Sequence, residues 1–250
     1  MEYTRLRRNL AGVIRLAPTP SGFLHLGNLV NFELVNRLAQ DLSLKLLLRI
    51  DDADAGRLRE QYTTDIYRVL EFLDIQPDFT SASQLERTAV YWDALKDLAA
   101  QGAPLFVCTC SRTQMPNRRC EAGCDRTLAE FSATSGEDRV RLRYETEDVT
   151  LWGREHPSYH LVSCVDDRDY GVTHVVRGDD LKPSTQIHKN LNTYLGHNVR
   201  FAHHELLLDN QGNKLSKSHG TDQLELTSDL KDAVNATADR LISGVLAQFS

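Results

Sequence analysis

Apolar residues form two buried-strand patterns around one helical pattern near the start of the chain. Residues 12–16 and 44–50 are nearly continuous apolar runs, which is typical of strands that are covered on both faces. Over residues 26–40, apolar side chains recur every three or four positions, as in an amphipathic helix. Strand, helix and strand in this order predict a βαβ unit with parallel strands and a right-handed crossover.

The same patterns continue along the chain. Helices are predicted at residues 57–73, 89–100 and 185–195. Strands are predicted at residues 105–107, 171–176 and 201–208. Residues 139–144 and 159–165 are strand-like or ambiguous, and residues 221–250 have room for one or two helices, around Leu230 and 241–246. These elements predict an α/β fold with a Rossmann-type parallel sheet flanked by helices.

The loop between the first strand and the first helix carries candidate chemistry. Residues 15–28 read Arg-Leu-Ala-Pro-Thr-Pro-Ser-Gly-Phe-Leu-His-Leu-Gly-Asn, and the prolines and glycine force an irregular backbone. His25 and Gly27 fall at the first turn of the helix, where free N–H groups and a partial positive charge favour a phosphate. Taken alone, this stretch strongly favours a simpler interpretation, a capped turn that carries a surface histidine.

A second stretch, Lys214-Leu-Ser-Lys-Ser218, favours a functional interpretation of the first over a capped turn. The first stretch resembles the HIGH signature of class I aminoacyl-tRNA synthetases, and the second resembles their KMSKS signature. The form Arg-x-Ala-Pro-x-Pro-x-Gly-x-Leu-His-x-Gly is that of the glutamyl/glutaminyl branch. The resemblance implies an ATP-dependent ligase that also uses Mg²⁺. It implies ATP binding by Pro18, His25, Gly27, Asn28 and Lys217, and catalytic roles for His25, Lys214 and Lys217.

The same resemblance implies a glutamate site at Arg15, Asp51, Tyr159 and Arg177. Glutamyl enzymes usually have Arg-Ile-Glu-Asp where this chain has Arg-Ile-Asp-Asp, so the carboxylate of Asp51 is one methylene shorter. A buried guanidinium that faces a neutral amide costs several kcal/mol, on the order of a broken buried ion pair. Arg177 therefore favours an acidic substrate, glutamate over glutamine. Aspartate stays open as an alternative.

Four of the five cysteines form the pattern Cys-x-Cys-x9-Cys-x3-Cys, at Cys108, Cys110, Cys120 and Cys124. In a cytosolic chain such a cluster favours metal binding over disulfides, and four thiolates suit tetrahedral zinc. With four protein ligands the site is closed, so one structural zinc ion is expected. Cys164 stands apart and is expected to be a small buried apolar residue.

Within the glutamyl branch, the chain most resembles the glutamyl-queuosine tRNA-Asp synthetases. These are catalytic cores without an anticodon-binding domain, and they carry zinc in a Cys-x-Cys…Tyr-x3-Cys segment. Here Cys120 stands where tyrosine is common. The resemblance implies ATP, L-glutamate and queuosine-bearing tRNA-Asp as partners. Two alternatives stay open: a glutamate-adenylating ligase with a non-tRNA acceptor, and a non-enzymatic, zinc-stabilised RNA-binding module.

The expected organisation has four parts. The first half of the catalytic domain covers 1–102, a zinc-binding segment on the acceptor side covers 103–150, the second half with the KMSKS-like loop covers 151–220, and a short helical extension without an anticodon-binding domain covers 221–250.

Composition narrows the function classes. The apolar content of 41% and the charged content of 26% are ordinary for a globular protein. The net charge of -6 argues against broad nonspecific nucleic-acid binding, which needs many cationic contacts to phosphate. The N-terminal sequence lacks a signal-type apolar segment. A cytoplasmic monomer that does not contact membranes is expected.

Overall fold

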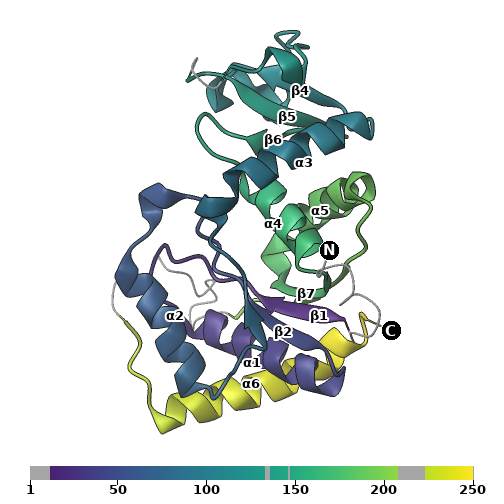
Figure 1. The fold of residues 1–250 in the computed structure, drawn as a ribbon. Coiled ribbons are helices and arrows are strands. Elements are labelled where there is room, and N and C mark those ends of the chain that lie inside the picture. Colours follow the sequence, from purple (N-terminus) through teal and green to yellow (C-terminus); the bar gives the residue numbers. More distant parts are fainter. Residues whose placement is uncertain (1–11, 133–135, 146, 208–222, 250) are drawn as a thin grey trace, which may run out of the picture. The chain divides into compact units, whose positions relative to one another are not determined.

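The computed structural model describes residues 12–132, 136–145, 147–207 and 223–249 (Figure 1). The chain divides into two compact units. The sheet unit comprises the described residues of Met1–Ala82, Tyr170–Lys182 and Val199–Ser250. The cysteine unit comprises the described residues of Ser83–Asp169 and Pro183–Asn198. The four parts expected from the sequence stay predictions.

The sheet unit contains the predicted parallel sheet. Its five strands lie in the order β3-β2-β1-β7-β8, and every neighbouring pair is parallel. Their bounds are β1 Val13–Leu16, β2 Lys45–Leu48, β3 Phe79–Thr80, β7 Val172–Gly178 and β8 Arg200–His204. The βαβ unit predicted from the first apolar runs is therefore confirmed. The predicted strand 201–208 ends at His204.

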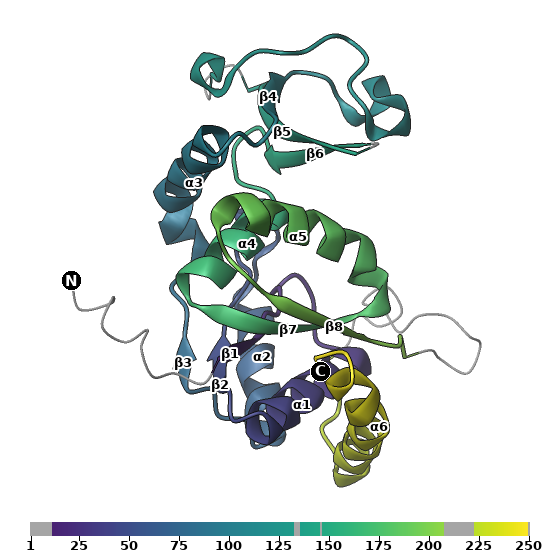
Figure 2. The same cartoon turned by 90° about the vertical axis from the view of Figure 1, so that its right-hand side faces the viewer.

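Helices α1 (Leu26–Asp41), α2 (Glu60–Phe72) and α6 (Ser228–Leu246) belong to the same unit, with α6 lying along α1 (Figures 1 and 2). The apolar side chains of α1 pack with those of the strands and of α6 in one core. At the edge of that contact, the guanidinium of Arg37 on α1 pairs with Asp239 and donates to Asn235, both on α6. Residues 228–246 form one continuous helix, whereas the sequence left one or two helices open.

The cysteine unit has an antiparallel sheet in the order β4-β5-β6, formed by Leu105–Cys108, Arg139–Tyr144 and Glu147–Trp152. Strand β6 was not predicted from the sequence. The unit also contains α3 (Thr88–Ala100), α4 (Tyr159–Asp169) and most of α5 (Lys182–Leu195). Buried Asp166 on α4 joins α3, because it accepts hydrogen bonds from Tyr91 Oη at 2.9 Å and from Arg87 Nε at 3.0 Å.

Helix α4 resolves a segment that the sequence left ambiguous. Residues 159–165 are helical, although their pattern is strand-like. The residues from Leu161 to Asp167 are all buried, including polar Ser163 and Asp166. A helix that is buried around its whole circumference has no polar face, so the period of 3.6 that identifies a surface helix is lost.

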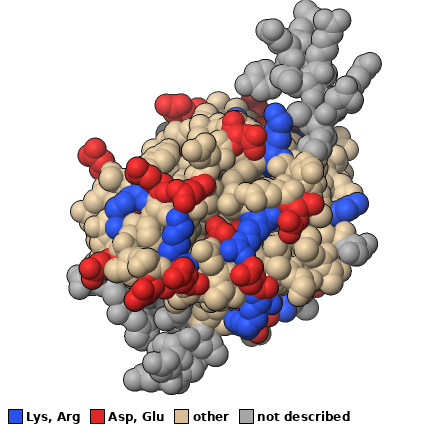
Figure 3. Space-filling model, turned by 90° about the horizontal axis from the view of Figure 1, so that it is seen from below, with Lys and Arg blue, Asp and Glu red and all other residues tan. Residues whose placement is uncertain are grey.

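The surface carries charges of both signs. On the face shown in Figure 3, acidic and basic side chains alternate over short distances. Among the described residues, no helix combines the length and apolar character that crossing a membrane requires.

Candidate functional site

His25 caps the start of α1, and its side chain is held by the first turn of that helix. Its Nδ1 accepts a hydrogen bond from the backbone N–H of Gly27 at 3.1 Å, while Asn28 Oδ1 accepts from the backbone N–H of His25 at 3.0 Å. Because Nδ1 is an acceptor, the proton of the neutral imidazole is on Nε2. His25 is therefore prepared to donate a hydrogen bond from Nε2, as contact with a phosphate oxygen requires.

Gly27 is needed for this arrangement. A Cβ atom at residue 27 would lie 3.0 Å from Cε1 and 3.1 Å from Nδ1 of His25, closer than ordinary contact. A larger residue would push the imidazole away from its capping position. The glycine of the first signature thus acts through the histidine, in addition to leaving the helix start open to a ligand.

The loop after β1 is joined to the segment after β2. The carbonyl of Pro18 accepts from the backbone N–H of Asp51 at 2.9 Å, and the carbonyl of Leu16 accepts from the N–H of Arg49 at 2.9 Å. These bonds extend the parallel pairing of β1 and β2 beyond the strands. They bring the predicted ATP loop and the predicted glutamate carboxylate together at the carboxyl ends of the strands, where ligands bind in open α/β sheets.

Three arginines lie on one face of this sheet. In β1, Ile14 and Leu16 belong to the core that contains α1, so Arg15 faces the other way. The same alternation places Arg177 of β7 on the side of Val175, opposite Val176. Arg49 continues β2 in the alternation that puts Leu48 in the α1 core and Leu47 on the other side.

All three arginines are buried. Their exposed fractions are 6% for Arg15, 0% for Arg49 and 4% for Arg177. The guanidinium carbon of Arg177 lies 5.1 Å from the ring centroid of Phe201 on β8, in a cation–π contact. Guanidiniums gathered on one sheet face are suited to bind an anionic ligand.

Asp51 has a partner that the sequence analysis missed. Arg49 Nε donates to Asp51 Oδ1 at 2.6 Å, and Arg49 Nη2 donates to Oδ2 at 3.3 Å. The signal was present in the sequence, since residues two apart in an extended chain share a face. Arg49 holds the carboxylate of Asp51 in a fixed orientation, and Asp51 is 8% exposed.

Tyr159, the fourth predicted glutamate residue, belongs to the cysteine unit and begins α4. It is 40% exposed. Its ring lies 5.3 Å from that of His188 on α5 and 5.5 Å from that of His160. His160 Nδ1 lies 3.1 Å from Nε2 of fully buried His188, so one of these nitrogens carries the shared proton. Cys164 is buried as predicted, and its Sγ–H points at the His188 carbonyl 3.9 Å away.

A cavity of about 810 Å³ lies within the cysteine unit beside Tyr159 and His160. Arg118, Arg139 and Arg141 line it. Burial, followed by the positive charges of Arg154 and Arg141, holds the pKa of Arg139 below its ordinary value.

Buried polar atoms in this cavity lack partners. Within the described part of the chain, Arg141 Nε, Asp148 Oδ1 and Ser158 Oγ have no hydrogen-bond partner, and all three residues line the cavity. Glu147 and Asp148 line the same cavity, so its charged lining is mixed and suits a polar ligand. The sequence analysis missed it, although alternating arginines in the stretch Arg-Val-Arg-Leu-Arg at residues 139–143 mark one strand face.

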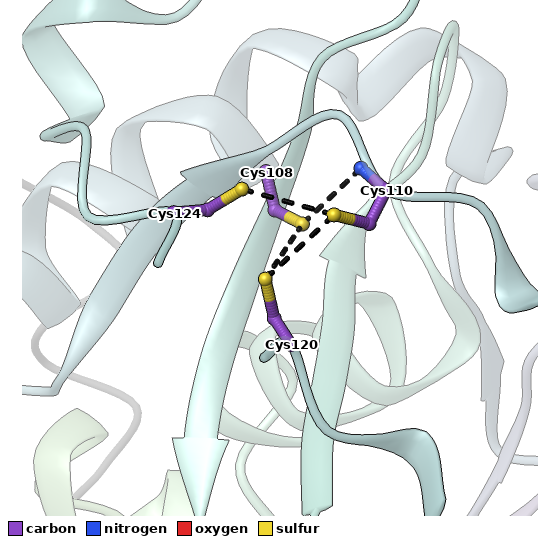
Figure 4. A group of neighbouring side chains, drawn as sticks. All are labelled: Cys108, Cys110, Cys120 and Cys124. Carbon is purple, nitrogen blue, oxygen red and sulfur yellow. Dashed lines mark hydrogen bonds between the residues drawn. The ribbon is translucent and has the colours of Figure 1, made fainter. Parts of the chain in front are cut away.

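The four predicted metal ligands come together at the end of β4 (Figure 4). The Sγ atom of Cys120 lies 3.8 Å from that of Cys108 and 3.7 Å from that of Cys110, and the Sγ atoms of Cys110 and Cys124 are 3.8 Å apart. A tetrahedron with Zn–S bonds of about 2.3 Å has edges of about 3.8 Å. The three Sγ–Sγ distances match such edges, and all four sulfur atoms lie within 4.8 Å of one another, so the cluster could hold a zinc ion.

The surroundings of the cluster fix its ligands. The backbone N–H of Cys120 donates to buried Asp148 at 2.7 Å, and Arg141 donates to the carbonyl of Cys110 at 2.9 Å. Burial, and then the hydrogen bonds that the Cys110 thiol donates to the neighbouring sulfur atoms, raise the pKa of Cys110 to about 12. A bound dication reverses this, because coordination requires the thiolate and stabilises it.

Lys214 and Lys217 lie outside the described residues. Their predicted contacts with ATP stay predictions.

A family model described as "tRNA synthetases class I (E and Q), catalytic domain" matches residues 13–151 and 138–242. A protein of Rhodobacter capsulatus named Glutamyl-Q tRNA(Asp) synthetase is 32% identical over 82% of this chain and 90% of its own length. A Synechococcus protein of the same name is 32% identical over 92% of this chain and 82% of its own length. The mitochondrial glutamate--tRNA ligase of Saccharomyces cerevisiae is 30% identical over 87% of this chain, but this chain spans only 48% of that protein.

Solved structures agree on the fold. A glutamate tRNA ligase from Elizabethkingia meningosepticum superimposes with a TM-score of 0.69 and 22% identity, over 83% of this chain and 52% of that chain.

Proposed function

Because the chain belongs to the family of class I tRNA synthetase (E and Q) catalytic domains, and is thus a ligase of that class, we propose that it activates L-glutamate with ATP and transfers the glutamyl group to tRNA. The acceptor proposed is the queuosine base of tRNA-Asp. The names of the Rhodobacter and Synechococcus relatives support this acceptor, and those relatives match over most of their own length.

The observation that carries the proposal is the set of charged groups on one sheet face. Glutamate has two carboxylates and one ammonium. Arg15 and Arg177 offer guanidiniums for the carboxylates, and Asp51, oriented by Arg49, offers a carboxylate for the ammonium. Tyr159 is proposed to add a polar contact. A neutral amide in place of the side-chain carboxylate would offer Arg177 no opposite charge from the substrate.

In the first step, an oxygen of the substrate α-carboxylate attacks the α-phosphorus of ATP. The new bond is the carboxylate–phosphorus bond of glutamyl-adenylate, and the bond to pyrophosphate breaks. His25 donates from Nε2 to a phosphate oxygen at the start of α1, and Lys214 and Lys217 neutralise the leaving pyrophosphate. Mg²⁺ bound with ATP supplies further charge neutralisation. Catalysis thus consists of positioning and charge stabilisation, without a protein nucleophile.

In the second step, a hydroxyl of the acceptor attacks the mixed anhydride, and AMP leaves. We propose that the cavity of the cysteine unit receives the phosphate backbone of this RNA, because three arginines line it against two carboxylates. Arg139→Ala should weaken tRNA binding about equally for all sequences. It should also reduce the slope of log affinity against log salt by about 0.7 to 0.9.

The four cysteines are proposed to hold one zinc ion with a structural role. The set is closed, so the ion keeps no position for a substrate. It would hold β4 and the segment of residues 109–124 in one conformation, next to Arg141 and the cavity.

One experiment tests the activity. ATP–pyrophosphate exchange is measured with glutamate, glutamine and aspartate, with and without tRNA. Exchange that occurs with glutamate, but not with glutamine or aspartate, supports the proposal. Exchange with aspartate would show that the shorter Asp51 changes the substrate, and no exchange under any condition would indicate an RNA-binding module instead.

A second assay identifies the acceptor. Transfer of labelled glutamate to queuosine-bearing tRNA-Asp, but not to tRNA-Asp without queuosine, supports the queuosine assignment. Glutamate-dependent exchange without transfer to either tRNA would indicate a non-tRNA acceptor.

A further inference from the structure

A buried carboxylate on α2 connects two distant parts of the sheet unit. Asp65 is completely buried, and its Oδ2 accepts from the backbone N–H of Leu24 at 2.9 Å. Its Oδ1 accepts from Gln223 Nε2 at 2.9 Å and from Arg68 Nη2 at 2.8 Å. Arg68 Nη2 also donates to the carbonyl of Leu224 at 3.1 Å. One side chain thus contacts residues 24 and 223 directly and residue 224 through Arg68.

The contact with Leu24 lies immediately before the first signature histidine. His25 follows Leu24 and caps α1, so the position of the Leu24 backbone sets the position of the His25 side chain. The ring of Phe23 also packs edge-on against Tyr62 of α2, with centroids 5.1 Å apart. Helix α2 therefore supports the signature loop at two consecutive residues.

The contact with Gln223 lies just beyond the second signature, since this residue follows Ser218 by five positions in the sequence. The lysines of that signature are outside the described residues, and the contact itself uses only Gln223 and Leu224. Leu224 packs against the same core that contains Leu24. The chain on the C-terminal side of the second signature is thereby fixed to the helix that fixes the first.

We propose that Asp65 is a positioning residue for ATP: it sets the His25 turn and the chain after Lys217 on one common anchor. This inference rests on the proposed adenylation activity. Asp65 has no contact with substrate in the proposed mechanism, and it acts through the backbone of Leu24 and the side chain of Gln223. Removing its charge changes the geometry of the His25 turn and of residues 223–224, while Arg15 and Arg177 keep their places in β1 and β7.

The test is a swap of hydrogen-bonding groups. In Asp65→Asn, the amide Nδ2 faces donors, so at least one of Leu24 N–H, Gln223 and Arg68 loses its acceptor. The expected result is a KM for ATP that rises about tenfold in glutamate-dependent exchange, with the KM for glutamate changed less than twofold. In Asp65→Asn combined with Gln223→Glu, the new carboxylate at position 223 accepts from the introduced amide and from Arg68. This double variant should recover most of the ATP affinity that is lost in Asp65→Asn alone or in Gln223→Glu alone.

The matched control is Asp74→Asn. Asp74 closely follows α2 and accepts from Lys231 Nζ of α6 at 2.7 Å, so it also ties α2 to the C-terminal part of the chain, but away from both signatures. Asp74→Asn should leave the KM for ATP unchanged. Gln223→Ala keeps the buried carboxylate intact and serves if Asp65→Asn does not fold; it should raise the KM for ATP severalfold.

Amide hydrogen exchange gives a readout that does not depend on activity. Asp65→Asn should speed exchange in peptides that cover residues 20–28 and 223–227, and Asp74→Asn should not. The inference is overturned if Asp65→Asn and Gln223→Ala leave both the KM for ATP and this exchange unchanged, or if Asp74→Asn changes them equally. A wild-type protein without any ATP–pyrophosphate exchange would refute the proposed function, and the hydrogen-exchange comparison would still decide whether Asp65 fixes the two segments.

Discussion

Arg49 and Asp51 form a buried ion pair at the carboxyl end of β2, with Nε and Oδ1 2.6 Å apart. The pair balances the charge of Asp51 before any substrate ammonium arrives. It also holds the shorter aspartate side chain in one orientation. Asp51 is therefore part of a charge pair with Arg49, rather than a single carboxylate.

Replacing Arg49 should destabilise the protein. Arg49→Met leaves Asp51 buried without its cation, and breaking a buried pair costs roughly 3–5 kcal/mol. Urea unfolding should show this loss. The double variant Arg49→Met, Asp51→Leu should recover stability without recovering glutamate-dependent exchange. An unchanged urea midpoint for Arg49→Met would show that the pair contributes little.

Arg177 should decide the use of acidic substrates. Arg177→Gln removes a buried guanidinium from the face that is proposed to bind the side-chain carboxylate. Loss of one partner of a buried charge pair costs on the order of 2–5 kcal/mol, so kcat/KM for glutamate should fall by at least about 30-fold. The kcat/KM of Arg177→Lys for glutamate should lie between those of the wild type and of Arg177→Gln, because lysine keeps the charge but not the bidentate geometry. A KM for glutamate equal to that of the wild type in Arg177→Gln would place the carboxylate elsewhere.

The cysteine cluster should bind one zinc ion per chain. Cys120→Ser should lower the zinc content well below one per chain, and it should lower the thermal midpoint by roughly 10 °C if several kcal/mol are lost. Elemental analysis and calorimetry measure these two effects. Cys164→Ala is the control, because Cys164 is buried far along the chain from the cluster and should keep full zinc content. Protein that is isolated without zinc and is equally stable with and without a chelator would contradict the assignment.

His174 should make stability depend on pH. Burial, and then the charge of Arg200, lowers the pKa of His174 below its ordinary value of 6.5, because the imidazole packs against Phe249 in the sheet unit. The folded state therefore disfavours the protonated form. The stabilising contribution is complete above pH 6.5 and is lost as the pH falls below that value through the lowered pKa. The free energy of unfolding should decline as the pH is lowered from about 7.5 to about 5. In His174→Gln this decline should be less steep. Parallel curves for the two proteins would assign the decline to other groups.

The sequence determined the parts of this protein that depend on local pattern. The pattern of apolar residues was sufficient to predict β1, α1 and β2, with apolar runs at 12–16 and 44–50 and a helical period between them. A strand buried on both faces and an amphipathic helix have different periodicities. The cysteine pattern predicted a cluster, because four thiols fall within seventeen residues, and the structure brings these four together. His25 was identified as a helix-start residue by its motif, and its capping role is confirmed.

Only the tertiary structure decided the features that depend on residues far apart. Helix α4 was ambiguous because burial on all sides removes its periodicity, and burial is set by the other elements of its unit. No local pattern shows that Asp65 contacts both residue 24 and residue 223, or that Arg15 and Arg177 share one sheet face, because strand order brings residues together independently of their separation in the sequence. The sequence thus indicated which side chains are suited to chemistry, and the packing of strands and helices decided which of them lie together.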